Sequence, residues 1–257
     1  PMPKIVGAET KDLVELLKSP ERWTRQKAKD ALAQRPVKPT AAAIVQWAVQ
    51  LDAKDPRHDH HLLEALAACA KMESVQPALL DRVLRAKDPR ARAFAARIAG
   101  RWDDRLPNAN TYLARAANDE HPQVRMEAIL ACGQSTRPAA IRAAAEAVTR
   151  HARDGWIDYA FTQAVHHHER HWRPALTEGR LDFGGDVQSM AAVLEKRGSR
   201  DLLNVLLRLA KSPDIDATAR HGIFNGIASI GGPTELRTIF EKQFHADPAS
   251  QAAAFVA

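Results

Sequence analysis

Cysteine is scarce in this chain of 257 residues, which has only Cys69 and Cys132. The two lie in separate alanine-rich stretches and form neither a CxxC nor a CxxCH motif, so they encode no zinc site and no attached haem. A disulfide between them is not expected, because they are far apart in the repeat pattern described below. We expect each cysteine to be a small, buried apolar residue.

Long hydrophobic runs and catalytic motifs are also missing. No apolar run approaches the roughly 18 residues that a membrane-spanning helix needs. No glycine-rich phosphate loop follows a strand, no serine sits in a nucleophile elbow, and Asp182-Phe183-Gly184 lacks every other kinase feature. The sequence therefore predicts no catalytic residue and no cofactor.

The chain shows no signal peptide, and it opens with Pro1-Met2-Pro3, which is not a natural start. It ends on the apolar residues 252–257. We expect a piece of a longer protein, so the missing signal says nothing about the compartment.

Aromatic residues make up only 5% of the chain, whereas hydrophobic residues reach 45%, and alanine is the commonest of them. This composition favours helices that pack closely through small side chains, and it argues against sheets.

The stretch from Leu79 to Gly133 repeats itself. Equivalent residues of the two copies lie 33 positions apart: Pro89 and Pro122, Arg92 and Arg125, Ala95 and Ala128. Each copy predicts a helix, a tight turn at the proline and a second helix, and Gly133 is expected to end its helix in left-handed geometry. A repeat of this length indicates an all-α, right-handed α-solenoid of stacked helical repeats.

The repeat pattern divides the chain into four parts. Residues 1–10 are a lead-in, and 11–170 are a first sub-array of repeats. Residues 171–186 are expected to be an irregular insertion, because Pro174, Gly179 and the run from Asp182 to Gly185 interrupt the helical periodicity. Residues 187–257 form a second sub-array.

Acidic residues and arginines recur at the turns. Asp88 and Glu120 are expected to cap the second helices of their repeats, and Ser19 to cap a helix over 21–34. Arginines follow within two helical turns, within reach of an acid or a free carbonyl of the neighbouring repeat. We predict a structural ladder of Asp88, Arg92, Glu120, Arg125 and Arg25. The alternative is that these arginines line a groove for an anionic partner.

Histidines and tryptophans supply the remaining candidates. The helical spacing of His61 with Glu64, or of His167 with His171, suits a metal ion. No such pair recurs in the repeats, however, so we predict no metal site. The tryptophans are interpreted mainly as wedges between helical layers. The candidate partner surface consists of Trp23, His60, His61, Trp102, Trp156, Asp158 and Tyr159.

The net charge of +6 and the pI near 9.5 suit nucleic acid, acidic lipid or an acidic protein as a partner. The arginines sit at repeat positions and not in runs, which favours an ordinary solvated surface. Helical-repeat DNA glycosylases use a basic concave groove with Trp and Asp, so a nucleic-acid-binding or DNA-repair protein is the alternative function. A continuous basic stripe would favour it, and pairing of Arg25, Arg92 and Arg125 with acids would count against it.

Six segments together carry a family resemblance: Ser19–Arg25, His60–Leu66, Ala86–Ala93, Asp119–Ala128, Trp156–Ala160 and Leu181–Gly185. They resemble the HEAT-repeat region of large multidomain proteins of planctomycetes and related bacteria, usually described as membrane-bound dehydrogenase or haem-binding proteins. The resemblance implies a β-propeller before this region, a c-type cytochrome domain with CxxCH after it, and a location in the periplasm or otherwise outside the inner membrane. Neither the propeller nor the haem motif is in this chain, so redox activity does not carry over.

The resemblance and the repeats together predict a solenoid of about six to seven HEAT-like helix pairs. The function we expect is a non-enzymatic scaffold that binds a protein partner or the neighbouring domains of the same polypeptide.

Overall fold

The computed structural model describes residues 3–197 and 202–211, together with positions 220, 223, 224, 227, 228, 231–234 and 237. All regular structure in these residues is helical, which confirms the predicted all-α solenoid of HEAT-like repeats. The elements are α1 Thr10–Glu15, η1 Leu16–Lys18, α2 Arg22–Ala33, α3 Val37–Val49, α4 His58–Lys71, α5 Pro77–Val83, α6 Pro89–Arg101, α7 Ala109–Ala117, α8 Pro122–Gln134, α9 Ala140–Thr149, α10 Gly155–His167, α11 Glu169–Thr177, α12 Val187–Arg197 and α13 Leu203–Leu209.

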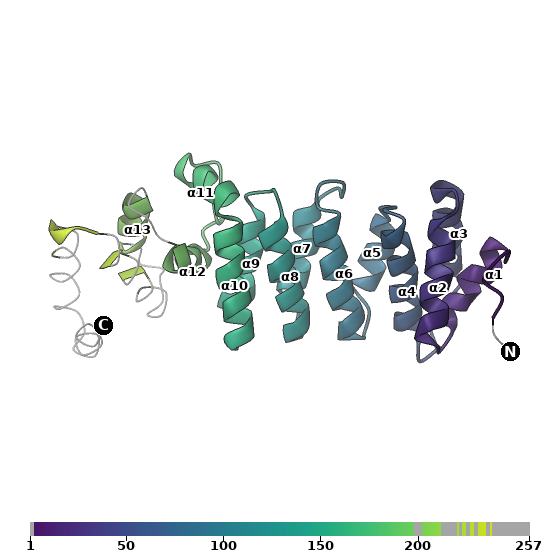
Figure 1. Ribbon diagram of the computed structural model, residues 1–257. Helices are drawn as coiled ribbons and strands as arrows, with labels where there is room; N and C mark the ends of the chain where they lie inside the picture. Colours follow the sequence, from purple (N-terminus) through teal and green to yellow (C-terminus); the bar gives the residue numbers. More distant parts are fainter. Residues whose placement is uncertain are drawn as a thin grey trace.

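The helices stand side by side in a row with α1 and α13 at opposite ends (Figure 1). Helices α2, α4, α6, α8 and α10 form one layer, and α3, α5, α7 and α9 lie behind them. The apolar core runs between the layers and is built largely from alanine and leucine. Among the described residues no helix is both long enough and apolar enough to cross a bilayer.

Proline starts the second helix of the central repeats, as the sequence predicts. Pro89 and Pro122 occupy the first turns of α6 and α8, where a missing backbone N–H leaves no acceptor unsatisfied. The Asp88 side chain caps α6 by accepting from the backbone N–H of Arg90 at 2.9 Å. The prediction that Glu120 caps α8 is wrong. The N-cap of α8 is His121, whose Nδ1 accepts from the backbone N–H of Gln123.

Two helix starts near the N-terminus also differ from expectation. Ser19 does not cap α2, whose N-cap is Glu21; the Ser19 hydroxyl accepts instead from the backbone N–H of Glu21. Pro36 and Pro39 predict a break in the chain over 35–39, but helix α3 begins inside it, at Val37, because a proline in a first turn costs no hydrogen bond.

Gly133 does not end α8. It lies inside the helix, and a Cβ placed on it would be 3.0 Å from the Cα of Ala164 on α10. Gly100 of α6 plays the same part, since its Cβ would be 2.6 Å from the Cβ of Ala131 on α8. Both glycines therefore permit close approach of neighbouring helices, and no left-handed backbone is involved.

The segment 171–186 is only partly irregular. Its first part belongs to α11, which contains Pro174 in its interior and buries Trp172. The Trp172 indole donates to the carbonyl of Val165 at 2.9 Å and holds α11 against the end of α10. Helices α12 and α13 lie in the part of the chain predicted to be the second sub-array. Ser212-Pro213-Asp214 in the sequence predicts one more turn of the repeat. It lies outside the described residues, as do the end at 252–257 and most of the predicted second sub-array after 211.

Both cysteines are buried free thiols, as expected for small apolar residues. Burial raises the pKa of Cys69 and of Cys132 to about 12, so neither is a thiolate at neutral pH.

Candidate functional site

Three arginines make the same contact within their own repeats. Each lies four positions after the N-cap of its helix, and its Nη1 donates to the carbonyls five and six residues before it. These bonds measure 2.8 to 3.0 Å and join Arg25 to Ser19 and Pro20, Arg92 to Ala86 and Lys87, and Arg125 to Asp119 and Glu120. Each arginine thereby satisfies carbonyls of the turn between its two helices.

The rest of each guanidinium reaches the next repeat. Arg92 Nε and Nη2 donate to the two carboxylate oxygens of Asp119 at 2.7 and 2.9 Å. Arg25 Nε donates to Glu64 at 2.8 Å, and Arg125 Nη2 donates to the carbonyl of Ala152 at 3.0 Å. The arginines are thus largely buried between repeats and present little charge to solvent.

The acids of this arrangement differ from those expected. Glu120 is not a close partner, because its side chain is 90% exposed and lies 3.5 Å from Arg92, whereas Asp119 takes the two-pronged contact. The hydrogen bond to Asp119 raises the pKa of Arg92. Burial favours a raised pKa for Glu64, but Lys29 and Arg25 outweigh it and lower that pKa overall.

Two residues expected on the partner surface occupy the position of these arginines in other repeats. His61 lies four after the N-cap of α4, is 1% exposed, and sits 3.6 Å from Asp55. Its assignment to the surface is wrong; burial lowers its pKa below the usual value. Asp158 holds the position in α10 and pairs with Lys196 at 3.1 Å and Arg153 at 3.2 Å.

Trp102 is likewise not at the surface, because it is completely buried. It is the C-cap of α6, and the C-caps of α8 and α10 are Ser135 and His168, at intervals of 33 residues. All three side chains are buried. A side chain this large and fully enclosed is a packing residue.

Four residues of α8 and α10 form an exposed apolar surface, which we call the α8–α10 surface. Trp156 and Tyr159 are 76% and 62% exposed, and Leu130 is 41% exposed beside the half-buried Met126. Met126 and Tyr159 are repeat equivalents, 33 residues apart, on helices that pack side by side, so the four share one face. Sequence reasoning missed Leu130 and Met126, although this interval relates them to positions on α10.

The other expected surface residues lie elsewhere. Trp23 is 56% exposed on α2, at the position that Trp156 has on α10, and His60 is half-buried on α4. Helices α4, α6 and α8 separate α2 from α10 in the row (Figure 1). The candidate residues therefore belong to two separate regions.

The histidines of the described residues do not gather with enough acids or thiols to hold a metal ion. His168 is completely buried, and neither ring nitrogen has a hydrogen-bond partner. Burial, together with the charge of His171 nearby, lowers the pKa of His168 to about 4, so the ring is neutral at pH 7.

The comparison with known families matches residues 76–165 to the family described as HEAT repeats. The match runs from the start of α5 almost to the end of α10 and covers the helix pairs with the closest packing. No curated protein matches the chain.

Proposed function

We propose that this chain is a non-enzymatic scaffold that binds a protein partner through the α8–α10 surface. The exposure of Trp156 and Tyr159 carries the proposal. Two aromatic side chains and a leucine on adjacent helices form an apolar patch of the kind that marks interaction sites. Trp and Tyr are also the residues that contribute most binding energy in protein interfaces. HEAT repeats in general suggest a scaffold or protein-interaction role.

The ladder arginines favour a protein partner over nucleic acid. A helical array that binds nucleic acid needs a continuous basic stripe for the phosphates. Arg25 and Arg92 face acids of the next repeat, and Arg125 faces carbonyls, so these guanidiniums are committed to contacts within the chain. Duplex and single-stranded DNA are therefore expected to bind only weakly at low salt, and not at physiological salt.

We also propose that the array belongs to a larger exported protein with a dehydrogenase-like propeller and a cytochrome domain. The resemblance of the six segments supports this proposal. The test is the complete open reading frame: a propeller domain before this chain and a CxxCH motif after it are expected. A complete frame with neither would reject this context without affecting the binding proposal.

The binding proposal is tested by photo-crosslinking in the native host. A photoreactive phenylalanine analogue is placed at Trp156, at Tyr159, or at Val49, which is 62% exposed on α3 in the other layer. We expect one discrete crosslinked protein at positions 156 and 159 and none at 49. The partner is then purified and titrated against the native chain.

A double variant, Trp156→Ser with Tyr159→Ser, provides the decisive control. Loss of two exposed interface aromatics is expected to weaken binding at least about 30-fold, which corresponds to about 2 kcal/mol. Equal crosslinking at all three positions, or unchanged affinity of the double variant for the purified partner, would reject the α8–α10 surface as the binding site.

A further inference from the structure

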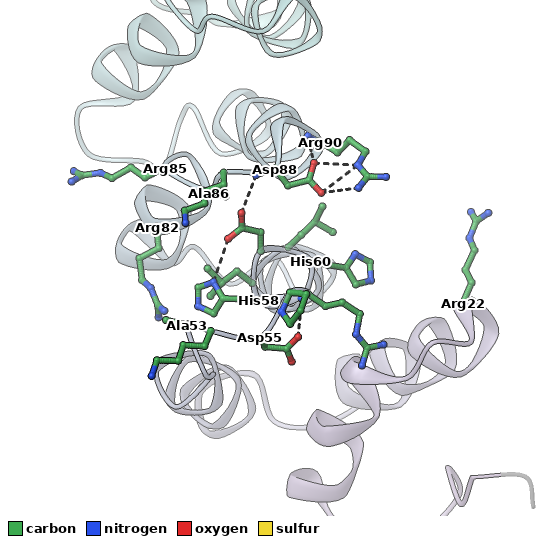
Figure 2. Close-up of a pocket in the computed structure, with 17 residues that line it drawn as sticks. Arg22, Ala53, Asp55, His58, His60, Arg82, Arg85, Ala86, Asp88 and Arg90 are labelled. Atoms are coloured by element: carbon green, nitrogen blue, oxygen red, sulfur yellow. Dashed lines mark hydrogen bonds and ion pairs between the residues drawn. The ribbon is translucent and has the colours of Figure 1, made fainter.

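A basic groove lies at the other end of the molecule, away from the α8–α10 surface. It has a volume of about 1550 Å³ and is bounded by α2, the turn before α4, the start of α4 and the turn between α5 and α6. Figure 2 shows Arg22 of α2 and Arg90 of α6 projecting on the same side of α4 as His60. Three consecutive repeats therefore contribute to one concavity.

The groove carries more positive than negative side chains. Seven lysines and arginines line it against three aspartates, which leaves four positive charges in excess. All three aspartates already have partners: Asp55 accepts from the backbone of Arg57, Asp59 from the backbone of Asp88, and Asp88 from Arg90.

Four of the seven cationic side chains have no hydrogen-bond or ion-pair partner among the described residues. Arg82 donates to the carbonyl of Ala48, Arg85 pairs with Asp81, and Arg90 pairs with Asp88. The remaining side chains make no hydrogen bond or ion pair with any residue that the structure describes, and all are exposed: Arg22, Lys54, Arg57 and Lys87. They are free to bind an anionic ligand without breaking a contact of the fold.

The backbone also contributes to the positive electrostatic potential of the groove. Helices α2 and α4 begin at the groove with Glu21 and Arg57 as N-caps, and neither N-cap side chain accepts from a backbone N–H. The N-terminal end of an α-helix carries a partial positive charge and unpaired N–H groups. At α4 this charge adds to that of the free cations around it.

The groove also has an apolar component that distinguishes between anions. Leu62, Leu63, Pro56, Ala53 and Ala86 line it between the charged groups, and the structure places no aromatic side chain other than histidine among the lining residues. Single-stranded nucleic acid needs aromatic platforms for its bases, and the three aspartates would repel a continuous phosphate backbone. A peptide whose carboxylates alternate with apolar side chains matches both components.

We propose that this groove binds an acidic, partly apolar peptide segment of a partner protein. The carboxylates of the peptide meet Arg22, Lys54, Arg57 and Lys87, and its apolar side chains pack against Leu63 and Pro56. The site is separate from the α8–α10 surface and gives the scaffold a second point of attachment.

The test measures fluorescence anisotropy with a labelled peptide in which Glu and Leu alternate. The groove variant replaces Arg22, Lys54, Arg57 and Lys87 with Gln. The control variant replaces the same number of charges at other exposed positions: Lys4, Lys11, Lys38 and Arg208. Circular dichroism and thermal unfolding check that both variants are folded, as expected for side chains without partners.

The native chain and the control variant are expected to bind the peptide equally. The groove variant is expected to bind at least about tenfold more weakly, because it lacks all four cations that meet the carboxylates of the peptide. Replacing Glu with Gln in the peptide is expected to abolish binding. The Trp156→Ser, Tyr159→Ser variant should bind like the native chain, so this test is independent of the first surface.

Three outcomes would overturn the proposal. Equal weakening in the groove and control variants would show only unspecific charge attraction. Equal binding of the Gln peptide would show that the carboxylates are not recognised. Tighter binding of a short single-stranded DNA, lost in the groove variant, would assign the groove to nucleic acid instead.

Discussion

The centre of the array and its N-terminal end are built from the same repeat but pack differently. In α6 and α8 the residue twelve positions after the N-cap is glycine, and a Cβ there would lie closer to the next helix than van der Waals contact allows. The same position is Ala33 in α2 and Cys69 in α4. The central helices pack against each other more extensively than α2, α4 and α6 do. A difference of a few side-chain atoms at one repeat position therefore distinguishes the closely packed centre from the end that carries the groove.

The arginine ladder follows the same division. Arg92 and Arg125 occupy consecutive repeats in the centre and bind the turns on both sides of them. Toward the N-terminus Arg25 shares Glu64 with Lys29, and the neutral His61 replaces the arginine in α4. The N-terminal end thus lacks the ladder arginine in one of its repeats, and it carries cations that are available to a ligand.

The largest expected effect comes from filling the close approach in the centre. Gly100→Leu places a side chain where even a Cβ would lie 2.6 Å from Ala131. We expect a loss of about 3 to 4 kcal/mol in the free energy of unfolding, measured by urea denaturation, because overpacking forces α6 and α8 apart. Gly155→Ala is the control, since nothing lies within 4 Å of its Cβ, and it should change stability by less than about 0.5 kcal/mol.

Substitution of the ladder arginines tests whether the ladder contributes more stability in the centre of the array than at its N-terminal end. Arg92→Met leaves Asp119 nearly buried without its partner and should cost about 3 kcal/mol of unfolding free energy. Arg25→Met should cost less, about 1 to 2 kcal/mol, because Lys29 stays 2.6 Å from Glu64. Denaturation of both variants beside Arg90→Ala, whose native side chain is 79% exposed, gives the ranking. A larger loss at Arg25 than at Arg92 would contradict the comparison.

Acid should weaken the fold through His168 more than through His61. The folded pKa of His168 is about 4 against an ordinary value of 6.5, so the unfolded chain binds more protons between these pH values. Stability is retained above pH 6.5 and falls as the pH drops toward 4, by about 2 to 3 kcal/mol from this group alone. Burial also lowers the pKa of His61, but the charge of Asp55 opposes that shift.

To test this prediction, the unfolding free energy is measured between pH 7 and 4 for three proteins: the native chain, His168→Leu and His61→Leu. His168→Leu should remove the larger part of the pH dependence, which also includes carboxylates common to all three proteins. A pH profile of His168→Leu that parallels the native one would show that the ring is not held neutral by the fold.

The smallest expected effect on stability belongs to the proposed interaction surface. Trp156→Ser with Tyr159→Ser removes side chains that are mostly exposed, so unfolding free energy should change by less than about 0.5 kcal/mol. Thermal denaturation checks this. A loss of several kcal/mol would mean that these aromatics support the array and are not reserved for a partner.

The sequence was sufficient for the repeat, and therefore for the fold, because proline, arginine and alanine recur at 33-residue intervals. It located the turn at Asp88 and the ladder arginines. It did not distinguish Asp119 from Glu120 as the partner of Arg92, because two adjacent acids differ only in the direction that the turn gives them.

Burial was the harder property to predict for single residues. Trp23 and Trp102 look alike in sequence, yet one lies near the start of α2 and is exposed while the other closes the end of α6 and is buried. Gly133 has the features of a helix stop, and only the neighbouring helix shows why a Cβ is excluded. The groove was not predictable, since its cations come from three repeats that sequence spacing alone does not bring together.

Hydrogen–deuterium exchange of the native chain, resolved by helix, tests the difference between centre and end most directly. We predict that α6 and α8 exchange slowest, because their opening costs the most free energy, and that α2 and α4 open at a lower free energy. We also predict that Gly100→Leu removes this protection from α6 and α8 and leaves the exchange of α2 nearly unchanged. Uniform protection across the array, or greater protection in α2 and α4 than in α6 and α8, would contradict the account.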